Sequence, residues 1–176
     1  MIELNDRQNI EMVKQEVNID DFDLSKLRLF SCLSEQEIAI VRAQCDACSF
    51  DPGDTILERG ALDKSVYFII DGCAHVLNYS SSGRAVTYAS AAQGEMFGEM
   101  AAIDGLPRSA WVCAISYCEL IRIREETFMD FVKNNSTFAI SVLQKLSSNI
   151  RELDKRLINI LSLGACLLYT SPSPRD

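Results

Sequence analysis

The middle of the chain alternates short apolar runs with turns marked by glycine. Between Cys48 and Arg124 the runs read CSF, TIL, SVYFII, AHVLNY, AVTYAS, AWVCAI and ELIRI. They are rich in β-branched and aromatic residues, and turn signals such as Asp71-Gly72 separate them at the spacing of one strand and one turn. The pattern predicts an antiparallel, jelly-roll-like β-roll, so the expected fold is mainly β within the α+β class.

Helical periodicity appears on both sides of the predicted roll. From Ser34 the chain reads SEQEIAIVRAQC, in which a serine cap, early glutamates and apolar positions at helical spacing predict a short amphipathic helix. After Arg124 the stretch EETFMDFVKNN predicts another short helix, because its acidic residues suit a helix start. Ser136 is then expected to cap a longer helix.

In the longer helix, apolar residues recur in steps of four and three. They are Ala139, Leu143, Leu146, Ile150, Leu153, Leu157 and Ile160. A stripe of two positions in seven is narrower than the face that a helix buries in its own domain, so it favours a coiled coil with a second copy. We therefore expect a homodimer with its seam from Leu143 to Ile160. A long helix packed on its own roll is the alternative.

These patterns divide the chain into four parts. They are a loosely attached leader (1–24), the roll with its short helices (25–133), the dimerisation helix (134–163) and a tail (164–176). The tail breaks the heptad and ends in Ser-Pro-Ser-Pro, which cannot continue a helix. It resembles a translated sequencing adapter at the end of a truncated reading frame, so we expect the tail to be non-native.

The charge balance narrows the possible partners. The 176 residues include 25 acidic and 17 basic ones, for a formal net charge of −8, and the basic residues form no cluster that would attract nucleic acid. This stretch of chain is therefore expected to bind no DNA by itself. Its N-terminus lacks the basic start and apolar core of a signal peptide, and no run is long enough to cross a bilayer. We expect a cytoplasmic protein with no membrane contact.

Cysteine and histidine give little sign of metal or catalytic chemistry. Seven cysteines, an odd number, are expected to remain thiols. Cys45 and Cys48 form a C-x-x-C pair, for which a metal or redox role is the alternative to simple burial. An enzyme of the cupin type, which is also a β-roll, would need several histidines, and His75 is the only one. No nucleophile and base pair is legible, so we expect neither an enzyme nor a metal site.

Residues 94–112, GEMFGEMAAIDGLPRSAWV, place charged residues among apolar ones. Gly98 lets the backbone approach a ligand, and EMAAI predicts a one-turn helix whose free amide hydrogens attract an anion. Arg108 and Ser109 suit phosphate oxygens, whereas Glu99 as a carboxylate accepts a hydrogen bond, as from a ligand hydroxyl. A phosphate beside a hydroxyl describes a ribose phosphate. An ordinary ion pair between Glu99 and Arg108 is the alternative.

The same stretch resembles the phosphate-binding cassette of cyclic-nucleotide-binding domains, in which a Phe-Gly-Glu turn, a short helix and a Pro-Arg-small-Ala segment enclose a cyclic nucleotide. The matching residues are Phe97, Gly98, Glu99, Met100, Ala101, Pro107, Arg108, Ser109 and Ala110. The likeness extends over LFSCLSEQEI, FDPGDTILERG, VYFIIDG and CELIRI. RSAWV and the long helix with RLINILSLGA at its end are similar to the Crp-Fnr type of bacterial transcription regulator.

The resemblance implies a module that senses cyclic AMP or a related cyclic nucleotide, with no other cofactor. Glu99 would hold the ribose 2′-hydroxyl, and Arg108 and Ser109 would hold the cyclic phosphate with the amides of Gly98 and Glu99. Members that bind cyclic AMP also take a base contact from the partner's dimer helix at a Thr-Ser pair, which here reads Leu146-Ser147. The implied ligand-binding residues are Gly98, Glu99, Met100, Ala101, Arg108, Ser109, Ala110 and Ser147. The resemblance also implies dimerisation through the long helix, where the heptad spacing gives the dimerisation residues Leu143, Leu146, Ile150, Leu153, Leu157 and Ile160.

The resemblance also implies that the full-length protein continues into a winged helix-turn-helix and binds DNA. Iron-sulfur relatives carry cysteines in the leader, and residues 1–31 contain none. Haem relatives use a histidine, and His75 lies outside the cassette. A regulatory domain of a kinase or channel, or a dimerisation scaffold that has lost its ligand, is the alternative.

Overall fold

The computed structural model describes residues 19, 22–24, 27, 29–31 and 33–169, with side chains described as far as residue 162. In chain order the elements are α1 (Glu35–Gln44), β1 (Cys45–Phe50), β2 (Thr55–Leu57), β3 (Val66–Asp71), β4 (Cys73–Tyr79), β5 (Ala85–Ala92), β6 (Met96–Phe97), α2 (Glu99–Asp104), β7 (Trp111–Ala114), β8 (Cys118–Ile123), α3 (Glu125–Asn134) and α4 (Ser136–Tyr169). Most of the predicted leader and the end of the predicted tail lie outside the described residues.

The strands form the two sheets of an antiparallel roll. One sheet has the order β1-β8-β3-β6 and the other has the order β2-β7-β4-β5. Each of the seven predicted apolar runs forms a strand, and β6 is an additional two-residue strand that pairs with β3. The predicted β-roll is confirmed.

The sheet that contains β3 and β8 has a core on each face, because alternate residues of a strand point to opposite sides. Tyr67 and Ile69 on β3 belong to the core between the two sheets. Val66 and Phe68 belong to a second core, which the helices and the segment around Leu24 cover from outside. The roll and the helices are thus joined through a single shared sheet.

The short helices begin and end close to their predicted bounds. Ser34 and Glu37 form a reciprocal capping box at the start of α1, as the serine and the early glutamates predict. The tight turn at Asp71-Gly72 is also confirmed, with a φ of 89° at Gly72. A Cβ on Gly72 would lie 2.2 Å from the carbonyl oxygen of Tyr117, so only glycine fits this turn.

The long helix α4 differs from its prediction at both ends. Asn135 caps it, because its Oδ1 accepts a hydrogen bond from the Phe138 amide at 2.9 Å, so the predicted cap at Ser136 is one residue late. The helix runs to Tyr169, beyond the expected end at residue 163. Helical hydrogen bonding depends on the backbone, so the end of the heptad at Gly164 does not end the helix.

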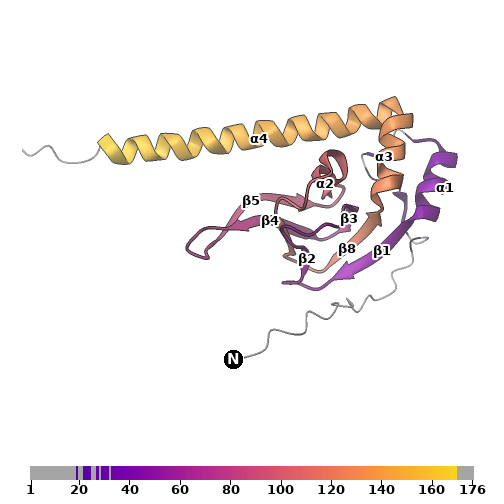
Figure 1. Ribbon diagram of the computed structural model, residues 1–176, viewed down its shortest axis with the longest axis horizontal. Coiled ribbons are helices and arrows are strands. Elements are labelled where there is room, and N and C mark those ends of the chain that lie inside the picture. The colour runs from indigo at the N-terminus through magenta and orange to yellow at the C-terminus, as the bar shows by residue number, and fades with distance from the viewer. Residues whose placement is uncertain (1–18, 20–21, 25–26, 28, 32, 170–176) are drawn as a thin grey trace, which may run out of the picture.

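An aromatic cluster anchors the start of α4. Phe138 is 1% exposed and packs against Phe30, Phe128 and Phe131, with ring centroids 5.9 to 6.2 Å apart. From this anchor α4 extends along the roll past α2 and β5 (Figure 1). Among the helices that the structure describes, none has the length and apolar character to cross a membrane.

Candidate functional site

The cassette folds around α2 and brings Gly98, Glu99 and Arg108 together. Gly98 is the N-cap of α2 and has a φ of 83°, in the left-handed region that favours glycine. Glu99 is 7% exposed and Arg108 is 3% exposed. A Cβ on Gly98 would lie 2.7 Å from Arg108 Nη1, so the glycine lets the guanidinium lie directly against the backbone.

Three hydrogen bonds hold the Arg108 guanidinium. Nη1 donates to the Gly98 carbonyl at 2.7 Å, and Nη2 donates to the Ser65 carbonyl and to Asp63 Oδ2, each at 2.6 Å. Arginine has five N–H donors, so about two remain available. One is Nε, which is buried and has no hydrogen-bond partner among the described residues. Arg108 therefore keeps a capacity for a further acceptor.

The sequence pattern gave no indication that Asp63 belongs to this site. It lies in the loop between β2 and β3, and its carboxylate accepts hydrogen bonds from Arg108 and, at 2.8 Å, from Ser65 Oγ. Burial acts to raise the pKa of Asp63, but the hydrogen bond from Arg108 and those from Ser65 lower it overall. Arg108 thus forms its ion pair with Asp63, and no ion pair between Glu99 and Arg108 is present in the described part of the chain.

Glu99 lies in the first turn of α2 with its carboxyl group almost wholly removed from solvent. Burial raises the pKa of this carboxyl, while its own backbone N–H and the positive charges of Lys145 and Arg108 act in the opposite direction. No other side chain in the described residues hydrogen-bonds to it. The carboxyl group therefore has acceptor capacity that no other side chain in the described residues uses.

The other predicted cassette residues divide into buried and exposed ones. Ala101 and Ala110 are buried, at 4% and 6% exposure, and their small side chains allow close packing. Met100 and Ser109 are exposed and face each other, since Ser109 Oγ lies 3.9 Å from Met100 Sδ. The structure thus brings seven of the eight predicted ligand residues into one cassette, with Ser147 apart on α4.

Two basic residues hold α4 against the roll. Lys145 forms an ion pair with Glu95, in the turn after β5, and Arg156 donates to the carbonyl oxygen of Tyr88 on β5. These contacts agree with the course of α4 past β5 in Figure 1. Neither contact was predicted, because each joins residues 50 or more positions apart in the sequence.

The predicted dimer seam is exposed along most of its length. Leu143, Ile150, Leu153, Leu157 and Ile160 are 48% to 68% exposed. Leu146 differs, because it is half-buried against the helical core. Large apolar side chains left exposed in a regular stripe are typical of an interface.

The C-x-x-C pair begins at the C-cap of α1, as expected, and lies along the strand that follows. Cys45 and Cys48 are on β1, where positions three apart face opposite sides, and they contact different cores. Burial raises the pKa of the Cys45 thiol to about 12, so it is not a reactive thiolate at neutral pH. Among the described residues no group of three or more side chains could hold a metal ion.

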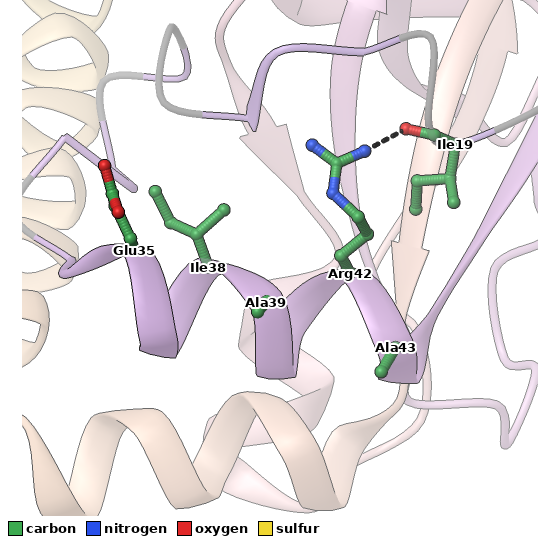
Figure 2. Close-up of a pocket in the computed structure, with 6 residues that line it drawn as sticks. All are labelled: Ile19, Glu35, Ile38, Ala39, Arg42 and Ala43. Atoms are coloured by element: carbon green, nitrogen blue, oxygen red, sulfur yellow. Dashed lines mark hydrogen bonds between the residues drawn. The ribbon is translucent and has the colours of Figure 1, made fainter.

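Two surface hollows are lined by none of the predicted ligand-binding residues. One, of about 480 Å³, is lined by Ile19, Glu35, Ile38, Ala39, Arg42 and Ala43 (Figure 2). Arg42 donates to the Ile19 carbonyl at 2.6 Å, which fastens the chain before α1 onto that helix (Figure 2). The other, of about 530 Å³, lies between α2 and α3. Neither Glu99 nor Arg108 lines either hollow.

The sequence profile of the cyclic nucleotide-binding domain family matches residues 47–135, which are half of the chain and contain the whole cassette. The chain therefore belongs to this family, as its resemblance implies. The family is a ligand-binding, regulatory domain rather than a catalytic one.

Relatives of two kinds share this domain. The cyclic AMP receptor protein of Thermus thermophilus is 26% identical over 129 residues, covering 73% of this chain and 60% of that protein. A regulatory subunit of cAMP-dependent protein kinase from Aspergillus fumigatus is 30% identical over 105 residues, covering 60% of this chain and 25% of that protein. The crystal structure of the Thermus thermophilus catabolite activator protein superposes with a TM-score of 0.65 at 26% identity, over 76% of this chain and 62% of that one. The chain spans about 60% of the first of these relatives.

Proposed function

We propose that this chain is the cyclic-nucleotide-sensing module of a Crp-Fnr-like transcription regulator, and not an enzyme. It binds cyclic AMP or a similar cyclic nucleotide in the cassette. Occupancy of the cassette biases the position of α4, which forms a dimer and transmits the signal to a DNA-binding domain. A ligand shifts such an equilibrium only by its different affinities for two states.

The spare hydrogen-bonding capacity of Arg108 is the observation that carries the proposal. A buried guanidinium with an unpartnered Nε beside the backbone of Gly98 suits an anionic ligand. In this arrangement Arg108 and Ser109 bind the cyclic phosphate together with the amides of Gly98 and Glu99. The buried, otherwise unpartnered carboxylate of Glu99 accepts the hydrogen bond of the ribose 2′-hydroxyl.

The exposed seam on α4 supports a homodimer. Ser147 is two positions after Lys145, so it lies about 200° around the helix and points away from the roll that Lys145 contacts. This orientation suits a base contact with the ligand of the partner subunit. The kinase-type alternative is disfavoured because a 34-residue helix with an apolar stripe suits a dimerisation helix.

DNA binding then belongs to a part of the protein beyond these residues, as the partial coverage of the bacterial relative suggests. A regulator that acts on bacterial DNA works in the cytoplasm, and the proposal places the chain there.

Calorimetric titration with cyclic AMP, and in parallel with cyclic GMP, tests the proposal. Arg108→Ala is expected to weaken binding by about 2 to 5 kcal/mol, the range for truncating one partner of a buried charged pair. Arg84→Ala is the matched control, because it removes an exposed arginine from the turn between β4 and β5. No saturable binding by the wild type, or equal binding by Arg108→Ala, would contradict the proposal.

A further inference from the structure

The two basic residues that hold α4 share one face of the helix. Lys145 and Arg156 are eleven residues apart, which amounts to about three turns and leaves them about 20° apart around the axis. Their partners, Glu95 and the Tyr88 carbonyl, lie after and within β5. Beyond the aromatic anchor, the face of α4 that meets the roll is therefore basic, about 100° away from the apolar seam.

Glu95 is itself held firmly. Its Oε2 accepts a hydrogen bond from the Ala92 amide at 3.0 Å, and its backbone carbonyl accepts one from the Ile69 amide at 2.9 Å. Glu95 is also only four residues before Glu99. The ion pair with Lys145 thus fastens α4 to a hydrogen-bonded turn that leads directly into the cassette.

The positive charge of Lys145 also affects the protonation of Glu99. Its positive charge is one of the two that favour the ionised form of the Glu99 carboxyl, and the other belongs to Arg108. The Arg108 side chain has three acceptors of its own, whereas the side chain of Lys145 makes a single hydrogen bond in the described part of the chain, the one with Glu95. Lys145 is therefore a charged side chain of α4 that connects the helix to the turn leading to Glu99, the residue that the proposed function assigns to the sugar.

We propose that Lys145 is a positioning residue of the nucleotide site. Its ion pair with Glu95 holds the turn before the cassette against α4, and this sets the Glu99 carboxylate where it meets the ribose 2′-hydroxyl. The inference rests on the proposed function and extends it, because it makes recognition of the sugar depend on the position of the dimer helix.

The test compares the Kd values for cyclic AMP and for 2′-deoxy cyclic AMP, which lacks the hydroxyl assigned to Glu99. The wild type is expected to prefer cyclic AMP by about tenfold or more, as for a hydrogen bond to a charged group. Lys145→Gln is expected to lower this preference to about threefold or less, and Lys145→Arg to retain it. Lys155→Gln is the matched control, since it removes an exposed lysine from the same helix.

Glu95→Gln provides a second route to the same result, because it removes the other partner of the ion pair and leaves α4 unchanged. Glu95→Gln is expected to lower the preference for cyclic AMP over 2′-deoxy cyclic AMP, as Lys145→Gln does. If Lys145→Gln does not fold, the result for Glu95→Gln tests the role of Lys145. Wild-type preference in both variants would overturn the role of Lys145 while leaving the proposed function intact. Failure of the wild type to bind either nucleotide would overturn the proposed function and the role of Lys145 with it.

Discussion

Gly98 gives the sharpest test of how the cassette is built. In Gly98→Ala, the new methyl group would lie 2.7 Å from Arg108 Nη1 and 3.1 Å from the Ser65 carbonyl, at a φ of 83°. Left-handed backbone costs a non-glycine residue about 1 to 2 kcal/mol. The clash must also displace the guanidinium, and each hydrogen bond of a charged group that is lost costs about 1.5 to 3 kcal/mol.

With one such bond lost, the expected loss of stability is therefore about 2.5 to 5 kcal/mol, measured by urea unfolding. Gly94→Ala is the matched control, because Gly94 has a φ of 82° and a Cβ there would meet no atom within 4 Å. It should lose only the backbone contribution of about 1 to 2 kcal/mol and keep its affinity for cyclic AMP. If Gly98→Ala matched Gly94→Ala in both stability and affinity, the close packing of Arg108 on Gly98 would not matter to the site.

Two further predictions concern charge and assembly. The folded-state pKa of Asp63 is lowered, so its pair with Arg108 stabilises the fold above the ordinary carboxyl range and is lost as pH falls through the lowered pKa. Asp63→Asn should therefore reduce the free energy of unfolding at neutral pH, by a modest amount because Asp63 is half exposed. The variant should also lose less stability than the wild type as the pH falls into the acid range. Unfolding curves at several pH values measure this, and an unchanged pH profile would contradict it. In sedimentation experiments at tens of micromolar, the wild type should be a dimer and the double variant Ile150→Asp, Leu157→Asp should be a monomer. A monomeric wild type would contradict the predicted seam.

The strands, turns and helix starts of this fold can be predicted because they depend on residues close together in the sequence. Strand alternation and glycine turns predict the seven main strands, and the serine and glutamate at Ser34 and Glu37 predict the start of α1. The two-residue strand β6 is too short to leave a pattern. The Asn135 cap was missed because two residues able to cap a helix stand side by side, and their sequence does not choose between them.

The parts of the site that could not be predicted come from distant pairings. Arg108 and Glu99 stand out as charges in an apolar stretch, but nothing in the spacing indicates that Asp63 is the partner of Arg108. The contact between Lys145 and Glu95 depends likewise on where α4 lies over the roll. Such contacts depend on how the whole chain folds, so a local sequence pattern cannot predict them.

The aromatic anchor at Phe138 gives α4 the geometry of a lever. Lys145 is seven residues from Phe138 and Tyr169 is 31, so at about 1.5 Å per residue these points lie about 10 Å and 46 Å from the anchor. For a rigid helix that pivots at Phe138, a movement of about 1 Å at Lys145 becomes about 4 Å at Tyr169. Under the proposed function, a movement at Lys145 smaller than an atomic radius would thus reach the far end of α4 as a shift about as long as the distance between successive Cα atoms, once the contact of Arg156 with Tyr88 is released.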